Sequence, residues 1–269
     1  MIAEDMTIDY LEAGEGHPVI LVHSSVSGAR QWRKLMETLA PSFRVMAVNL
    51  IGYGKTPAWT SPNGQALDDQ AALIEELIAT IDGPVSLVGH SFGGTVAMKV
   101  AHRLGQRIKS LVLLEPNPVF LLRDNGRPDA FAEAWSIRDI IKSNGAKDDW
   151  MTAAALFADY WGGAGTWAAT PVDRRETFAQ ALRPNFHEWD AVMSETIGLH
   201  TLAETLPQDT LVVYDPQTVR PIREVVELLH GATAWQFEAI AKGGHMAPLT
   251  HPEIVNPIVE RHLLSANKH

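Results

Sequence analysis

Short apolar runs alternate with amphipathic segments along most of the chain. The runs typical of strands lie at 6–13, 18–23, 44–50, 85–89, 108–115, 209–214 and 234–240. Apolar residues recur with helical spacing at about 29–40, 65–81, 92–104, 219–230 and 251–264. Pro257 lies inside the last helical segment and is expected to kink or split it. This alternation predicts an α/β fold, in which crossover helices connect the strands of a mostly parallel sheet.

The alternation stops between residues 117 and 206. This stretch has no run typical of a buried strand, and helical spacing recurs at about 128–143, 148–161, 172–182 and 185–199. It holds five of the eight tryptophans, which are Trp135, Trp150, Trp161, Trp167 and Trp189. The Gly-rich residues 161–165 predict a loop between two of these helices. We therefore expect a helical cap at 117–206, inserted into a core domain formed by 1–116 and 207–269.

One of the strand-like runs leads directly into Gly-x-Ser-x-Gly, with Ser91 at its centre. A helical segment follows at once, so the serine lies on a sharp strand-to-helix turn. Such a turn lifts the hydroxyl above the sheet edge and directs the first helical N–H groups at a reacting carbonyl. A Cβ at Gly89 or Gly93 would collide with a neighbouring strand or helix. Ser91 is the predicted nucleophile; the alternative is a capping hydroxyl in an ordinary strand–turn–helix.

Composition narrows the class of protein. The 269 residues carry a formal net charge of −10, which disfavours a nucleic-acid partner. The chain has no cysteine, which excludes disulfides, thiolate catalysis and zinc–sulfur sites. Residues 1–5 are acidic and lack the features of a signal peptide, and no apolar run approaches the length of a membrane span. We expect a cytoplasmic enzyme, a monomer or homodimer, with a small-molecule substrate and no membrane partner.

Four short segments occur in an order that resembles the α/β-hydrolase fold superfamily. They are residues 22–25, 49–56, 89–94 and 243–248. The resemblance implies a twisted, mostly parallel sheet flanked by helices, an inserted helical cap, a Ser–acid–His triad at the carboxyl ends of the strands, and no cofactor. His245 follows two glycines after a predicted strand, where it can accept the Ser91 proton. The alternative for His245 is an ordinary surface histidine, and no pair of histidines has the context of a metal site.

The resemblance also indicates an oxyanion hole, which two backbone N–H groups would form. One belongs to Phe92, and the other lies in the loop after His23, where Ser25 is the best candidate. Related sequences have glycine after this histidine, whereas this chain has Ser24. The serine can displace the loop or add its hydroxyl as a donor, and His23 is expected to brace the loop.

The acid of the triad is open from sequence. In the common pattern an Asp stands on the loop after the strand at 209–214, but Thr218 occupies that position. Glu115 ends the strand at 108–115, the place of a catalytic Glu in relatives that resemble haloalkane dehalogenases, and it is the preferred candidate. Asp215 is the alternative acid, and a site with no acid is the third possibility.

Three functions remain compatible with these residues. The first is a serine hydrolase that cleaves a small hydrophobic ester or lactone through an acyl-enzyme, with Ser24 and Trp161 as candidate substrate-binding residues. The second is hydrolytic C–C cleavage of a ring-fission product, which would need an arginine in the pocket, such as Arg123, Arg127 or Arg183. The third is a small-ligand receptor without catalysis. Dehalogenase and epoxide hydrolase chemistry is disfavoured because both demand Asp in place of the serine.

Overall fold

A computed structural model describes residues 7–268, so residues 1–6 and 269 lie outside the described residues. The first residue of the predicted strand 6–13 and the acidic N-terminal residues fall in that part. The strands are β1 (Tyr10–Ala13), β2 (His17–Val22), β3 (Phe43–Val48), β4 (Val85–His90), β5 (Ile108–Leu114), β6 (Thr210–Tyr214) and β7 (Gln236–Ala239). Within residues 7–268 they form one sheet in the order β1-β3-β2-β4-β5-β6-β7. Only β1 pairs antiparallel, so the predicted mostly parallel sheet is confirmed.

The sheet changes its direction of growth at β2. The chain moves from β2 to β3 on one side and later returns to β4 on the other side. Open α/β sheets bind ligands at the carboxyl ends of the strands where this reversal occurs. The loop after β2 and the turn after β4 therefore lie next to each other at the position expected for a site.

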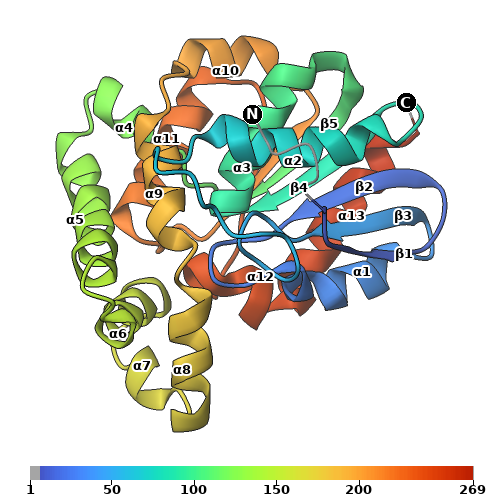
Figure 1. Cartoon of the computed structure of the whole chain (residues 1–269). Helices are drawn as coiled ribbons and strands as arrows, with labels where there is room; N and C mark the ends of the chain where they lie inside the picture. The colour runs from blue at the N-terminus through green and yellow to red at the C-terminus, as the bar shows by residue number, and fades with distance from the viewer. Residues whose placement is uncertain (1–6, 269) are drawn as a thin grey trace.

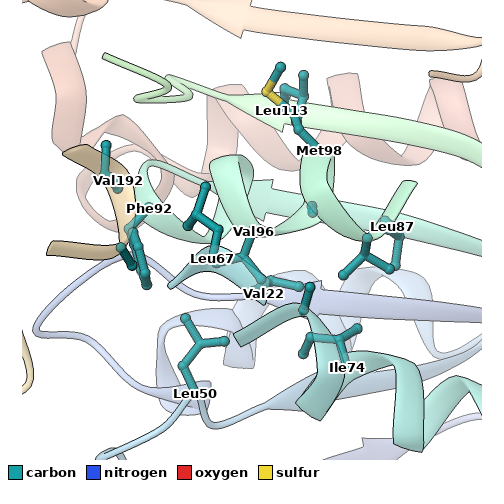
Figure 2. Packing of buried hydrophobic residues seen from close by; sticks show 14 of the residues in the cluster. Val22, Leu50, Leu67, Ile74, Leu87, Phe92, Val96, Met98, Leu113 and Val192 are labelled. Atoms are coloured by element: carbon teal, nitrogen blue, oxygen red, sulfur yellow. The ribbon is translucent and has the colours of Figure 1, made fainter. Parts of the chain in front are cut away.

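Helices cover both faces of the sheet (Figure 1). On one face lie η1 (Ala29–Trp32), α1 (Arg33–Leu39), α12 (Ala247–Thr250) and α13 (Pro252–Ala266). On the other lie α2 (Leu67–Ala79), α3 (Phe92–Leu104) and α11 (Arg220–Ala232), and the short η2 (Gly105–Arg107) and η3 (Gly244–Met246) belong to connections. Strand residues such as Val22, Leu87 and Leu113 belong to one buried cluster with Ile74, Val96 and Met98 of the helices (Figure 2). Burial on both faces explains the near-continuous apolar runs.

Seven helices and no strand lie between β5 and β6, in residues 117–206, here called the cap segment. They are α4 (Phe120–Asp124), α5 (Pro128–Gly145), α6 (Trp150–Gly162), α7 (Thr166–Ala169), α8 (Val172–Ala181), α9 (Asn185–Ser194) and α10 (Leu199–Thr205). Helices α5 to α8 extend beyond the sheet, in green to yellow on the left of Figure 1. No helix within residues 7–268 has the length and apolar composition needed to cross a membrane.

Two sequence expectations in the cap segment need correction. Trp161 is not in a loop but in the last turn of α6. The predicted helix 185–199 ends at Ser194, because Glu195 adopts an extended backbone conformation. Its side chain accepts hydrogen bonds from the N–H groups of Thr196 and Ile197, at 2.7 and 3.0 Å. Such bonds compete with helical ones and end the helix.

Pro257 does not split the last helix, although splitting is one of the two outcomes expected from the sequence. It lies inside α13, which runs from Pro252 to Ala266. The carbonyl that loses its partner belongs to Glu253, and both Glu253 and Pro257 are exposed. Water can satisfy a freed carbonyl on the solvent side, so the helix continues.

Candidate active site

Ser91 lies on a strained turn between β4 and α3. Its backbone has φ 53° and ψ −120°, a conformation that few residues other than glycine adopt. A Cβ at Gly89 would lie 2.4 Å from the Gly93 carbonyl oxygen, and a Cβ at Gly93 would lie 2.3 Å from the His23 carbonyl oxygen. The two glycines thus allow the close approach that the sequence predicts, and the Ser91 N–H donates to the Leu114 carbonyl at 3.0 Å.

The structure brings the predicted nucleophile and base together. His245 lies in η3, after β7, and its Nε2 is 2.9 Å from the Ser91 Oγ. Ser91 is 4% exposed and His245 is 5% exposed. At this distance the imidazole can accept the hydroxyl proton and later return it to a leaving group.

Glu115 approaches the far side of the imidazole. Its Oε2 lies 3.4 Å from His245 Nδ1, and its side chain is buried. The Asp215 N–H donates to Glu115 Oε1 at 2.6 Å, and the Thr218 hydroxyl donates to Oε2 at 2.5 Å. Thr218, at the position of the expected Asp, thus donates a hydrogen bond to the carboxylate that lies beside His245.

The Asp215 side chain contacts the backbone before His245 but not the imidazole. Its Oδ2 accepts from the Gly244 N–H at 2.9 Å, and its Oδ1 accepts from the Gln217 N–H at 2.8 Å. Of the two carboxylates left open by the sequence, Glu115 is the one near the ring. Asp215 instead fixes the loop that carries the histidine.

A buried chain of hydrogen bonds connects the two sides of the site, and no sequence motif predicted it. His90 Nε2 donates to the His245 carbonyl at 2.8 Å, and His90 Nδ1 accepts from the Gln31 amide at 3.0 Å. Burial, together with the nearby His245, lowers the pKa of His90 well below its usual value, so the ring is neutral. The Gln31 Oε1 in turn accepts from the Ser24 N–H and hydroxyl, at 3.1 and 2.8 Å.

The two candidate oxyanion donors line the same cavity as Ser91. Phe92 is the first residue of α3, so its N–H has no intrahelical acceptor. Within residues 7–268 no protein group accepts from the Ser25 N–H. The Ser24 groups bind Gln31 instead. His23 braces this loop: Nδ1 donates to the Ser24 carbonyl at 2.7 Å, and burial lowers the pKa of His23 to about 4.

The cavity above Ser91 has a volume of about 470 Å³. Its apolar lining comes mainly from the cap segment and includes Phe157, Trp161, Phe178, Trp189 and Val192. The Trp161 ring lies over the His245 ring with 4.2 Å between centroids. Ser24 and Trp161, the predicted substrate-binding residues, both line the cavity. The other three tryptophans of the cap segment do not line the cavity; they are Trp135, Trp150 and Trp167.

Charged groups are few in this cavity. Besides His245, the only titratable side chains of the described residues in its lining are Arg30 and Glu188. The three arginines considered for a C–C hydrolase lie elsewhere: Arg123 pairs with Asp124, Arg127 with Glu227, and Arg183 with Asp148. Within residues 7–268, no three His, Asp or Glu side chains gather as ligands of a metal ion would.

Sequence and structure comparisons agree with this architecture. Residues 19–258 match the model of the alpha/beta hydrolase family. The chain belongs to this family. In this alpha/beta hydrolase the family match includes the loop after β2, the Ser91 turn and the His245 loop.

Individual relatives differ in the substrate or reaction that they are named for. The chain is 36% identical to a 2-hydroxy-6-oxo-6-(2'-aminophenyl)hexa-2,4-dienoic acid hydrolase from Metapseudomonas resinovorans, over 39% of this chain and only 37% of that protein. It is 25% identical to a 2-hydroxymuconate semialdehyde hydrolase from Pseudomonas sp. (strain CF600), over 93% of this chain and 88% of that one. An esterase structure from Exiguobacterium antarcticum has a TM-score of 0.75 at 23% identity, covering 98% and 96% of the two chains.

Proposed function

We propose that this alpha/beta hydrolase is a serine hydrolase that cleaves a small hydrophobic carboxylic ester or lactone. The observation that carries the proposal is the 2.9 Å distance between Ser91 Oγ and His245 Nε2 at the floor of a largely apolar cavity. Apolar, partly aromatic pockets with a few polar groups suit hydrophobic acyl or alcohol groups. Catalysis of this type uses protein side chains, backbone N–H groups and water.

In the first half-reaction, Ser91 Oγ attacks the ester carbonyl carbon while His245 takes the hydroxyl proton. The carbonyl oxygen becomes negatively charged and accepts hydrogen bonds from the N–H groups of Phe92 and Ser25. His245 then gives its proton to the alkoxide leaving group, and an acyl-serine remains. In the second half-reaction, water loses a proton to His245 and attacks the acyl carbon. The returning proton restores Ser91 and releases the acid.

Glu115 has the role of the triad acid in this proposal. Its carboxylate accepts from Nδ1 of His245, which fixes the tautomer that leaves Nε2 free to accept a proton. The carboxylate also stabilises the imidazolium that forms during each half-reaction. Thr218 and the Asp215 N–H hold Glu115 in place.

Turnover of p-nitrophenyl butyrate by the wild type and by Ser91→Ala tests this function. We expect the substitution to lower kcat by about 10⁶-fold, since the nucleophile acts as a unit with its base. A fluorophosphonate should label the wild type at Ser91 and leave Ser91→Ala unlabelled. Ser136→Ala, on the exposed face of α5, serves as the matched control and should retain full activity. Saturable binding of small apolar esters without turnover would favour a receptor instead.

Hydrolytic C–C cleavage is the second candidate. Two relatives are named as hydrolases of a hexa-2,4-dienoic acid and of 2-hydroxymuconate semialdehyde, which are the kind of substrate that this reaction would use. The reaction would use the same serine and histidine but requires recognition of an anionic dienoate. Arg30 is the one arginine of residues 7–268 that lines the cavity, and the three arginines considered from sequence do not line it. Comparing kcat/KM for 2-hydroxymuconate semialdehyde and p-nitrophenyl butyrate decides between the two bonds.

A further inference from the structure

A buried carboxylate of the cap segment lies against the loop that carries the candidate oxyanion donor. Glu188, in α9, is 1% exposed and lines the cavity. Within residues 7–268 no Lys or Arg forms an ion pair with it. Its Oε1 accepts from the Tyr53 hydroxyl at 2.8 Å, and its Oε2 accepts from the Ser25 hydroxyl at 2.5 Å and from the Asn185 amide at 2.8 Å. These four residues are called the Glu188 cluster.

The loop held by this cluster has a strained backbone. Val26 has φ 69°, in the left-handed region that β-branched residues rarely adopt. Its N–H donates to the Tyr53 hydroxyl at 3.0 Å, and Tyr53 in turn donates to Glu188. Such conformations persist only where the surroundings hold them. The Tyr53–Glu188 pair provides that support.

Ser25, the residue on the other side of the Ser25–Val26 peptide bond, also forms hydrogen bonds with residues of α9. The Ser25 hydroxyl donates to Glu188 and accepts from the Asn185 amide at 3.1 Å. The Trp189 indole N–H donates to the Asn185 carbonyl oxygen at 2.9 Å, which fixes the amide orientation. Both residues that flank the Ser25–Val26 peptide bond therefore have partners that belong to α9 or bind it. The Ser25 N–H itself belongs to the preceding peptide unit, whose Ser24 carbonyl accepts from His23 Nδ1 at 2.7 Å, and the contacts with α9 hold Ser25 from its side chain and its C-terminal side.

We propose that Glu188 is a positioning residue that holds the Ser25–Val26 loop so that the Ser25 N–H faces the reacting carbonyl oxygen. The oxyanion hole is then complete only when α9 of the cap segment is seated on the core. This inference rests on the proposed hydrolase function, and it assigns the cap segment a part in catalysis besides lining the pocket.

A carboxylate suits this position better than an amide. All three partners donate hydrogen bonds, and an ionised carboxylate accepts from each of them. A glutamine would present one acceptor oxygen and one NH₂ group, so at least one donor would face another donor. Burial raises the pKa of Glu188 above its usual value, and the hydrogen bonds from Ser25, Asn185 and Tyr53 oppose that rise. Removing the charge therefore breaks the cluster while conserving volume.

Hydrogen–deuterium exchange on peptides containing residues 23–28 tests the positioning directly. In Glu188→Gln we expect exchange of this loop to be roughly tenfold faster, because its local opening becomes easier. Asp190→Asn is the matched control: it removes a carboxylate from the same helix that pairs with Lys142 outside the cavity. This control should leave the loop unchanged. Equal exchange in wild type and Glu188→Gln would overturn the proposal, whether or not the protein hydrolyses esters.

Ester kinetics supply the second readout. Loss of one oriented oxyanion donor lowers kcat by about 100-fold, and we expect this loss in Glu188→Gln with KM within about threefold of wild type. A purely structural role would lower the folded fraction and leave kcat per folded molecule unchanged. Should Glu188→Gln fail to fold, Tyr53→Phe removes both hydroxyl bonds while keeping the ring and should loosen the same loop. A wild type without esterase activity would refute the proposed function, and the exchange result would still decide the positioning.

Discussion

The core and the cap segment hold their polar groups in different ways. In the core, Ser91 and Glu115 both have positive φ, at 53° and 47°, and their N–H groups donate to carbonyls of neighbouring strands at 3.0 and 2.9 Å. The cap segment reaches the site through side chains, with Trp161 over His245 and Glu188 on Ser25. Ser91 and Glu115 are therefore positioned by backbone hydrogen bonds of the sheet, whereas the positions of Trp161 and Glu188 depend on how their helices pack.

The two regions also differ in the exposure of their large apolar side chains. The sheet strands β2 to β6 are almost entirely buried, whereas the cap helices expose large apolar residues such as Met151, Leu156 and Val172. The buried polar contacts that join the regions include the Glu188 cluster, the Lys99–Glu195 pair and the hydrogen bond from the Thr95 hydroxyl to Asn117. We infer that the core supplies the reacting groups and that the cap segment adjusts them. The predictions below test that division, from the largest expected effect to the smallest.

Removing the charge of Glu115 is expected to have the largest effect. Glu115→Gln should lower kcat by about 10⁴-fold, near 5 kcal/mol, because the imidazole loses the carboxylate that orients it. Steady-state ester kinetics measure the loss. Asp215→Asn is the matched control and should change kcat little, since Asp215 binds the backbone and not the ring.

The position of Thr218 allows a sharper version of this test. Its hydroxyl lies 2.5 Å from Glu115 Oε2, so an aspartate at this position would place a carboxylate near the same imidazole. In the double variant Glu115→Gln/Thr218→Asp we expect kcat to recover by about 10²-fold over Glu115→Gln alone, as the acid moves to the position common in the family. No recovery would mean that the backbone after β6 does not allow the introduced carboxylate to reach the ring.

The ion pair between Lys99 and Glu195 joins the core to the end of α9, and we expect its loss to lower the free energy of unfolding. Lys99 of α3 donates to Glu195 at 2.8 Å, and both side chains are largely buried. Lys99→Met leaves Glu195 unpaired and should lower the free energy of unfolding by about 3 kcal/mol in urea denaturation. The double variant Lys99→Met/Glu195→Gln removes both charges and should lose only about 1 kcal/mol. Equal losses in the single and double variants would refute the pairing argument.

Lowering the pH should reduce the free energy of unfolding, because the core contains buried histidines. Burial lowers the pKa of His23 to about 4, while the unfolded chain titrates near 6.5. Only the unfolded state gains this proton between these values, so the contribution is complete above pH 6.5 and is lost as the pH falls towards 4. From His23 alone we expect the free energy of unfolding to drop by about 2 kcal/mol between pH 7 and pH 5.

Urea unfolding at the two pH values measures this drop. His90 adds to it, because burial also lowers its pKa, and Glu188 opposes it, because burial raises the pKa of that carboxylate. His23→Asn should reduce the difference between the two pH values. His200→Asn, whose side chain is 86% exposed, should leave the difference as in the wild type. An unchanged difference in His23→Asn would remove His23 as its source.

Sequence patterns predict the local elements of both regions, including the cap helices α5, α6 and α8, far better than the contacts between the regions. The Ser91 turn, the strand ends and the Gly-Gly-His245 loop are local features, so a short motif carries their geometry. Glu115 is the preferred acid from sequence for the same reason, since it ends a strand. Glu188 and Tyr53 meet across 135 positions of the chain. No local spacing encodes such a contact, and the pattern wrongly places Trp161 in a loop because its neighbours are glycines.

Substitution of Trp161 is the test of the division between core and cap segment with the smallest expected effect. Its ring faces His245 at 4.2 Å, and an aromatic face stabilises a cation by about 1 kcal/mol, so it should favour the imidazolium formed during catalysis. Trp161→Leu should therefore lower kcat about fivefold, while Trp161→Phe retains a ring and should lose less. Phe178→Leu is the matched control, since Phe178 lines the cavity and its ring packs against Phe157 and Trp167. It should raise KM and leave kcat nearly unchanged, whereas a Trp161→Leu effect confined to KM would make Trp161 a pocket wall only.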